Sequence, residues 1–320
     1  MADAFVLAAG LGTRLRPLTD HRPKPLAPVC GVPMLAYSLA LCGKHGFRDV
    51  IVNAHWLADQ VERWAGEHEG VHVTVSTEPV LLGTGGGLRA VRDRLAERFV
   101  VVNADVLCDV DLRELVEFVP DGGACMSLRH HAVDAARYGV VAANADGVIV
   151  RLTAVASLPG ERAFTNDTHF TGVHAMHRST LDLVPDGLQC IVRTAYKALV
   201  PQRKVRGLDH DGLWLDIGDP EAYLAANLAA LAGDLDLPLD PFTRQGDRGI
   251  LAGAKVEGAV WVGKDVQLGR DVTLRNVVLG DGARVADGAD LVDCVVWDGA
   301  SIAGSHRRTI AHDGGHLAVG

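Results

Sequence analysis

A six-residue period near the C-terminus constrains the fold of this chain more than any other sequence feature. Aliphatic residues recur at this spacing, with two shortened steps, at Ile250, Val256, Val262, Leu268, Leu274, Leu279, Val285, Leu291, Val296 and Ile302. In a parallel β-helix, each coil buries such inward aliphatic residues against its neighbours. A β-sandwich gives no reason for a period held over this length. We therefore predict a short β-helix of about three coils over residues 249–304.

The first 232 residues follow a different rhythm, in which short β-rich runs alternate with amphipathic stretches. We expect strands at residues 4–8, 50–53, 71–76 and 99–103, and helices at 34–45, 58–68, 88–98, 112–118 and 222–231. This order predicts an α/β domain, Rossmann-like, with a mainly parallel sheet covered by helices on both faces. Ligands of such sheets bind where the strands end at their carboxyl termini. Residues 233–248, rich in Pro and Asp, form the expected linker, and residues 305–320 are left as a tail.

Composition excludes several classes of protein. The chain of 320 residues carries a net charge of −9, whereas a general nucleic-acid binder needs a positive field. We find no apolar stretch of roughly 20 residues that could cross a bilayer, and no basic region precedes the first apolar run as in a signal peptide. The six cysteines include no C-x-x-C pair and are expected as buried thiols. We expect a cytoplasmic protein with no nucleic-acid or membrane partner.

The loop after the first expected strand has the composition of a phosphate-binding site. Gly10 and Gly12 begin it, but Leu15 stands where a dinucleotide-binding fingerprint needs a third glycine, and no Gly-Lys-Ser/Thr follows as in a P-loop. The loop offers backbone N–H groups, the Thr13 hydroxyl and the Arg14 guanidinium, all of which suit a phosphate.

Basic residues gather around this loop although the chain as a whole is acidic. Arg14, Arg16, Arg22 and Lys24 fall within eleven residues that contain one acid, Asp20. Prolines on both sides of Lys24 restrict its backbone. The glycine loop alone, or the proline-flanked Lys24 alone, could be an ordinary solvated basic loop. The two together, at this spacing after a strand, predict an anion site.

Two aspartates are candidate ligands of Mg²⁺, which takes one or two protein carboxylates and fills its other positions with water and substrate oxygens. Asp105 follows the expected strand 99–103, although it could instead cap a helix or stand in a turn. Asp216 lies in Trp-Leu-Asp-Ile-Gly-Asp-Pro, where Asp219 is expected as a turn residue before the last helix.

A second glycine-rich run starts at Glu78 and holds four glycines in residues 83–87. Glycines let backbone approach a flat base, and a helix N-terminus favours anions. A purely structural turn between strand and helix is the alternative.

These motifs together resemble the sugar-nucleotide pyrophosphorylases, the nucleotidyltransferases that make nucleoside-diphosphate sugars. The resemblance is carried by residues 7–26, by the second glycine-rich run, by Tyr-Gly-Val-Val at 138–141, by Thr-Gly-Val at 171–173 and by the motif around Asp216. It implies a left-handed β-helix, Mg²⁺ held by Asp105 and Asp216, and catalytic roles for Arg14 and Lys24. The implied nucleotide contacts are Leu7, Ala9, Gly10, Gly12, Thr13, Glu78, Gly83, Thr84, Gly85 and Asn103. The implied contacts to the phosphorylated substrate are Gly139, Glu161, Arg162, Thr171 and Gly172.

The implied reaction joins a nucleoside triphosphate to a sugar-1-phosphate. A phosphate oxygen of the sugar attacks the α-phosphorus and pyrophosphate leaves, with the enzyme supplying position and electrostatic stabilisation. The Leu-Gly-Thr-Gly form resembles members that use GTP with mannose- or heptose-type phosphates, although uridylyl- and thymidylyltransferases carry close variants. The sequence departs from the family because no lysine occurs between residues 45 and 196 to hold the sugar phosphate. Arg162 or Arg151 could replace it.

Other readings stay open. A non-catalytic sugar-nucleotide-binding regulator could keep the fold, and a β-helix could carry acyltransferase chemistry. We expect the β-helix to act in scaffolding, homo-oligomer formation or regulation, so that deletion of residues 249–320 leaves nucleotidyl transfer intact. His169, His174 and His177 are expected as ordinary strand and loop residues, because their spacing does not fit a metal site.

Overall fold

The computed structural model describes residues 1–161, 163, 166–233 and 235–320, which form two compact units. Unit 1 consists of residues 1–10 and 38–214, and unit 2 of residues 11–37 and 215–320. This division differs from the one expected from sequence, because residues 11–37 pack with the C-terminal part of the chain. Each unit is described separately below.

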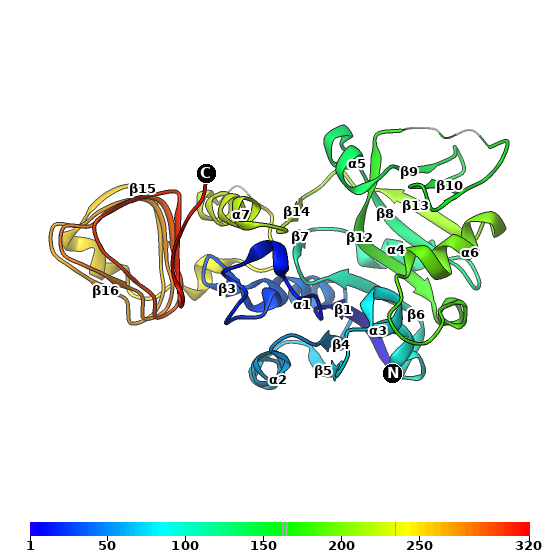
Figure 1. The fold of residues 1–320 in the computed structure, drawn as a ribbon, viewed down its shortest axis with the longest axis horizontal. Coiled ribbons are helices and arrows are strands. Elements are labelled where there is room, and N and C mark those ends of the chain that lie inside the picture. The colour runs from blue at the N-terminus through cyan, green and yellow to red at the C-terminus, as the bar shows by residue number, and fades with distance from the viewer. Residues whose placement is uncertain (162, 164–165, 234) are drawn as a thin grey trace. The chain divides into compact units, whose positions relative to one another are not determined.

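Unit 1 is built on a seven-stranded sheet with the order β13-β8-β12-β6-β1-β4-β5 (Figure 1). Its strands are β1 (Ala2–Leu7), β4 (Asp49–Ala54), β5 (His72–Thr77), β6 (Leu95–Asn103), β8 (Ala124–His130), β12 (Thr168–His177) and β13 (Val205–Asp209). Neighbouring strands are parallel except at β12, which runs antiparallel to both β6 and β8. The expected mainly parallel α/β fold is confirmed.

Helices and short turns connect these strands, and α2 packs against β5 while α4 packs against β6 and β12. The α-helices are α1 (Met34–Lys44), α2 (Ala58–Glu67), α3 (Gly83–Ala90), α4 (Leu112–Glu117), α5 (Ala132–Tyr138), α6 (Lys197–Leu199) and α7 (Pro220–Ala232). The 3-10 helices are η1 (Thr13–Leu15), η2 (Lys24–Leu26), η3 (Arg92–Arg94), η4 (Arg178–Leu183), η6 (Val200–Gln202), η7 (Pro241–Arg244) and η8 (Arg248–Gly253), and η5 (Val192–Tyr196) is a π-helix. Within the described residues, no helix has the length and apolar character needed to span a membrane.

The expected helix over residues 88–98 is wrong in its second half. The helix begins earlier, at Gly83, and ends at Ala90, and β6 already begins at Leu95. Leu95 is the register partner of Ala2, and both Leu95 and Phe99 are buried in the core of the sheet. Sheet pairing therefore overrides the helical preference of the Ala-Glu-Arg stretch between them.

Smaller sheets complete the chain. They contain β9 (Val141–Ala143), β10 (Ile149–Leu152) and β11 (Ala156–Ser157) in one antiparallel sheet, and β2 (Pro28–Val29) with β3 (Val32–Pro33) in a hairpin. β7 (Val106–Cys108) follows β6, and β14 (Trp214–Asp216) precedes α7.

The C-terminal part of unit 2 is a parallel β-helix, as the six-residue period predicts (Figure 1). One of its sheets contains β15 (Lys255–Val262), β17 (Thr273–Leu279), β19 (Asp290–Val296) and β22 (Thr309–His312), and another contains β16 (Gln267–Leu268), β18 (Arg284–Val285) and β20 (Ser301–Ile302). Thr273 pairs with Asp290 and Gln267 with Arg284, so one coil takes 17 residues. The periodic aliphatic residues from Leu274 onward are buried, whereas Val256 in the first coil is 39% exposed.

Residues 305–320, expected from the sequence to form a tail, continue the β-helix. They form β21 (Ser305–Arg307), β22 and β23 (Gly315–Ala318). β21 and β22 pair in parallel with β19, and β23 folds back antiparallel on β22. Ile310 and Ala311 are fully buried, so this segment packs into the β-helix.

Candidate active site

The ends of β1 and β6 lie side by side at the carboxyl edge of the unit 1 sheet. Leu7 is the register partner of Asn103, and its carbonyl accepts a hydrogen bond from the Ala104 amide at 3.0 Å. Ala9 is buried, whereas Gly10 is exposed, and a Cβ added at Gly10 would meet no atom within 4 Å. The backbone at Gly10 is therefore exposed, and its contact with a phosphate stays a prediction.

Glu78 has a different position from the one expected of a nucleotide contact. Its side chain is 3% exposed, and its carboxylate accepts hydrogen bonds from Asn53 Nδ2 and the Leu82 amide, both at 2.8 Å. Asn53 Oδ1 accepts a hydrogen bond from the Ala8 amide at 2.7 Å. Glu78 thus supports the first loop through Asn53, and this geometry favours a supporting role over direct contact with a base.

The glycines after Glu78 are explained largely by close packing against residues 187–191. The carbonyl of Gln189 accepts a hydrogen bond from the Gly85 amide at 2.8 Å, and a Cβ at Gly83 would lie 2.6 Å from the same oxygen. A Cβ at Gly86 would lie 2.1 Å from Gly187 O. Gly85 is buried, while Thr84 is exposed and its hydroxyl accepts a hydrogen bond from the Ile191 amide. The structural alternative therefore accounts for Gly85, whose contact with a base is unsupported.

Gly172 lies beside Asn103, and Thr171 precedes it in β12. Gly172 has φ +87°, and a Cβ there would lie 2.5 Å from Asn103 Nδ2, so glycine leaves room for this amide. The Thr171 hydroxyl donates to the Ser127 carbonyl at 3.1 Å, and the Thr171 carbonyl accepts from Trp214 Nε1 at 2.8 Å. The Thr171 hydroxyl is therefore buried and bonded within the protein, and Gly172 lies directly against the Asn103 side chain.

An aromatic group next to Thr171 was not singled out by sequence reasoning. The rings of Tyr138, His169 and Trp214 have centroids 4.8–5.8 Å apart. The guanidinium of Arg129 lies 5.9 Å from the Trp214 ring and 3.3 Å from a carboxylate oxygen of Asp134. Tyr138 and Trp214 belong to recognised motifs and could have been found from them, whereas Arg129 lies in no motif.

The remaining predicted substrate residues have other surroundings. Gly139 ends α5 with φ +96°, and its amide donates to the Ala135 carbonyl, so its conformation requires glycine at a helix C-terminus. Glu161 pairs with Arg203, which lowers the pKa of the Glu161 carboxyl. Arg162 lies outside the described residues. Arg151 donates to Asn166 Oδ1 at 3.4 Å and is exposed.

In unit 2, Gly12 packs against the residues that follow it. It has φ +63°, and a Cβ there would lie 2.9 Å from Thr19 Cγ2 and 3.2 Å from Lys24 Cβ. The Gly12 carbonyl accepts a hydrogen bond from the Thr19 hydroxyl at 2.8 Å. Lys24 begins η2 directly after Pro23 and is 8% exposed, whereas Thr13 is exposed. The prediction that Lys24 has a fixed backbone position agrees with this turn.

The side chains of Arg14 and Asp216 both lie close to Gly218. A Cβ at Gly218 would lie 3.0 Å from Arg14 Nη1 and 3.2 Å from Asp216 Oδ2, so glycine leaves space for both side chains. Asp219, expected as a turn residue, caps α7 by accepting a hydrogen bond from the Ala222 amide at 2.9 Å. The Trp-Leu-Asp-Ile-Gly-Asp-Pro motif therefore places a carboxylate beside the phosphate-loop arginine.

The two candidate metal ligands offer carboxylate oxygens, the donors that Mg²⁺ prefers. Asp105 stands in the turn between β6 and β7, and Asp216 ends β14; both are half-buried. Across the described ranges, no three His, Cys, Asp or Glu side chains group as metal ligands. His174 Nδ1 contacts the Tyr196 hydroxyl, and His177 Nε2 lies 3.2 Å from Glu97 Oε1.

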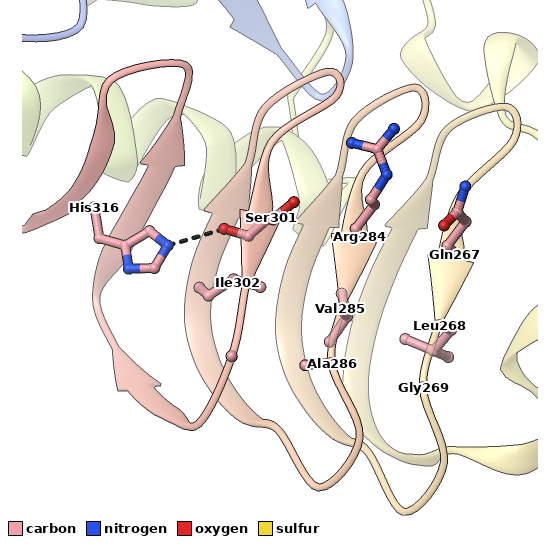
Figure 2. A pocket seen from close by; sticks show the side chains of 10 residues that line it. Gln267, Leu268, Gly269, Arg284, Val285, Ala286, Ser301, Ile302 and His316 are labelled. Atoms are coloured by element: carbon pink, nitrogen blue, oxygen red, sulfur yellow. Dashed lines mark hydrogen bonds between the residues drawn. The ribbon is translucent and has the colours of Figure 1, made fainter.

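A groove of about 510 Å³ lies on the β-helix, across β16, β18 and β20 (Figure 2). His316 Nε2 lies 2.9 Å from Ser301 O at one end of it. None of its lining residues belongs to the predicted phosphate loop or to the two metal-ligand motifs. The groove and the candidate site therefore share no residue.

Comparison with known proteins identifies the family. A family model described as nucleotidyl transferase matches residues 3–233, which is more than half of the chain. The chain belongs to this family. It is similar to mannose-1-phosphate guanylyltransferase of Mycobacterium tuberculosis, with 30% identity over 89% of this chain and 82% of that protein. It is also similar to a probable mannose-1-phosphate guanylyltransferase of Oryza sativa subsp. japonica, with 27% identity over 93% of this chain and 82% of that protein.

The fold of this nucleotidyltransferase is shared with a solved structure, HddC from Yersinia pseudotuberculosis, which was crystallised with GMP-PN. The TM-score is 0.57 at 23% identity, covering 71% of this chain and 98% of that one. The chain is therefore a nucleotidyltransferase enzyme, and its sequence relatives support nucleotide-sugar formation.

Proposed function

We propose that this nucleotidyltransferase transfers a guanylyl group from GTP to mannose-1-phosphate or a closely related sugar-1-phosphate. The observation that carries nucleotidyl transfer is the approach of Arg14 and Asp216 at Gly218, in the unit that also holds Lys24. The choice of GTP and mannose-1-phosphate is supported by the two guanylyltransferase relatives, each aligned over about nine-tenths of the chain.

In this mechanism, an oxygen of the sugar-1-phosphate forms a bond to the α-phosphorus of GTP, and the bond from that phosphorus to pyrophosphate breaks. The Arg14 guanidinium binds triphosphate oxygens with paired donors, and Lys24 neutralises charge near the α-phosphate. Asp105 and Asp216 would hold Mg²⁺, which when bound neutralises the charge of the reacting phosphates. No proton acceptor is required, because the sugar phosphate attacks as an anion.

We propose Arg129 as the cation that takes the place of the missing family lysine. It lies beside the Trp214 ring, whose indole N–H is bonded to Thr171, one of the predicted substrate residues. Arg151, in contrast, is exposed and bonded to Asn166. The Arg129→Ala variant should raise the KM for the sugar phosphate about tenfold or more while leaving the KM for GTP within twofold, since a charged hydrogen bond contributes about 1.5–3 kcal/mol.

A substrate panel tests the proposed function. Pyrophosphate release is measured from GTP, UTP, dTTP, CTP and ATP, each paired with mannose-, glucose-, galactose- and heptose-type 1-phosphates. We expect the highest kcat/KM for GTP with a mannose-type phosphate. Preference for UTP or dTTP would overturn the guanylyl assignment, and absence of release from all pairs would favour a non-catalytic regulator.

A further inference from the structure

The part of the sequence that contains Lys24 is anchored on the β-helix. Residues 11–37 belong to the same compact unit as residues 215–320, although the whole of unit 1 from residue 38 onward separates them along the chain. The sequence pattern does not predict this packing, because it indicates the β-helix as a separate scaffold. The contacts between the two segments involve two buried tryptophans of the β-helix, Trp261 and Trp297.

Arg22, two residues before Lys24, is held by the turn after β19. Its guanidinium carbon lies 4.7 Å from the centroid of the Trp297 ring. Nη1 donates to Asp298 Oδ2 at 2.9 Å, and Nη2 lies 3.8 Å from Asp313 Oδ2. A planar guanidinium can stack on an indole and pair with carboxylates at the same time, which a lysine ammonium cannot do.

The Trp297 ring is itself fixed by α7. Its indole N–H donates to the Tyr223 hydroxyl at 2.8 Å, and that hydroxyl donates to the Pro28 carbonyl. The ring therefore connects the β-helix to residues on both sides of Lys24, namely Arg22 and Pro28.

The far end of the segment is fitted to the other tryptophan. Gly31 has φ +68°, and a Cβ there would lie 2.0 Å from Trp261 Cη2. The neighbouring Cys30 amide donates to Asn227 Oδ1 at 2.9 Å. Residues 22–31, which we call the anchored segment, are thus held at both ends with Lys24 between them.

We propose that Arg22 is a positioning residue for nucleotidyl transfer, through which the β-helix fixes the location of Lys24. Pro23, with a φ of −65°, lies between Arg22 and Lys24. Because its ring restricts the backbone, a displacement of Arg22 should also displace Lys24, which begins η2. The inference rests on the proposed function, since it assigns Lys24 to the reaction. It also reverses the expectation that the β-helix is dispensable for transfer.

The test uses the full chain and compares matched aspartates. Asp298→Asn keeps an oxygen to accept from the Asp281 amide but removes the charge that faces Arg22. Asp287→Asn is the control, because Asp287 accepts from the Arg270 amide and pairs with the Arg270 side chain in the same way, without touching the anchored segment. Arg22→Ala removes the whole contact, and Arg22→Lys keeps only the charge.

We expect Arg22→Ala to lower kcat about 10- to 100-fold, because small misplacement of a reacting group costs up to about that factor. Asp298→Asn should lower kcat about three- to tenfold, Arg22→Lys should rescue part of the loss, and Asp287→Asn should stay within twofold of wild type. The KM for the nucleotide should change less than kcat, and thermal unfolding should show each variant folded at the assay temperature.

A double-variant comparison separates positioning from general stabilisation. In a Lys24→Ala background, Arg22→Ala should cause less than a twofold further loss, because its effect acts through Lys24. Losses that multiply in the double variant, or an Arg22→Ala kcat within twofold of wild type, would overturn the proposal. An inactive wild type would overturn the proposed function and this inference with it, whereas an active wild type with unaffected Arg22 and Asp298 variants overturns the inference alone.

Discussion

Replacing Gly10 by alanine tests whether this glycine is required by a ligand. An added Cβ meets no atom within 4 Å, and the φ of Gly10 lies outside the left-handed region. The free energy of unfolding should therefore rise slightly, by about 0.4–1 kcal/mol, because alanine restricts the unfolded chain. A phosphate approaching the loop amides would meet the new methyl group. We expect the KM for the nucleotide to rise about tenfold or more, equivalent to about 1.4 kcal/mol.

Chemical denaturation and steady-state kinetics with varied nucleotide measure the two effects separately. Gly86→Ala is the matched control, because its Cβ would lie 2.1 Å from the Gly187 carbonyl oxygen. It should lower the free energy of unfolding by about 1–3 kcal/mol through overpacking. An unchanged nucleotide KM in Gly10→Ala would refute the assignment of Gly10 to the phosphate loop, and a Gly86→Ala protein as stable as wild type would refute the packing argument.

Three further predictions follow from the site and its surroundings. Asp105→Asn and Asp216→Asn should each lower kcat by about 10²-fold or more in Mg²⁺, measured as pyrophosphate release, and wild-type turnover in either variant would remove that residue from the metal site. Burial lowers the pKa of His174 to about 3, so the unfolded chain binds a proton between about pH 6.5 and 3 that the folded chain does not bind. Because of His174, the free energy of unfolding should fall by about 1.4 kcal/mol for each unit by which the pH is lowered in this range. A His174→Gln protein whose unfolding shows the same pH dependence as wild type would contradict this. Cys190 is exposed, whereas burial raises the pKa of the other five thiols. A thiol reagent at pH 8 should therefore modify one cysteine in the native protein and six after unfolding. Modification of more than one cysteine in the native protein would contradict the burial of the other five.

The features of the fold that follow a local rule could be predicted from the sequence. The inward aliphatic period predicts the β-helix, and the last helix, predicted over residues 222–231, is observed over Pro220–Ala232. The errors arise where a distant partner decides the structure. The stretch before Phe99 is a strand because it pairs with β1, and residues 305–318 are strands because β19 and β22 offer edges for pairing.

The candidate site shows the same limit. Arg14 and Asp216 were each predicted from a motif, but their approach depends on the packing of distant segments around Gly218. Glycine-rich sequence at residues 83–87 suggested contact with a base, although a glycine required by a neighbouring backbone has the same sequence signal as one required by a ligand. Arg22 belongs to the basic run around the phosphate loop, yet its stacking on Trp297 is visible only in the folded chain.

Product formation followed by ³¹P NMR in the wild-type protein and in Lys24→Ala tests the central claim most directly. With GTP, mannose-1-phosphate and Mg²⁺, the wild type should form nucleoside-diphosphate sugar and pyrophosphate in equal amounts. Lys24→Ala, shown to be folded by its thermal unfolding, should retain about 1% of the rate or less, as expected for loss of a key electrostatic group. Equal rates in the two proteins, or consumption of GTP without a nucleotide sugar, would contradict nucleotidyl transfer at this site.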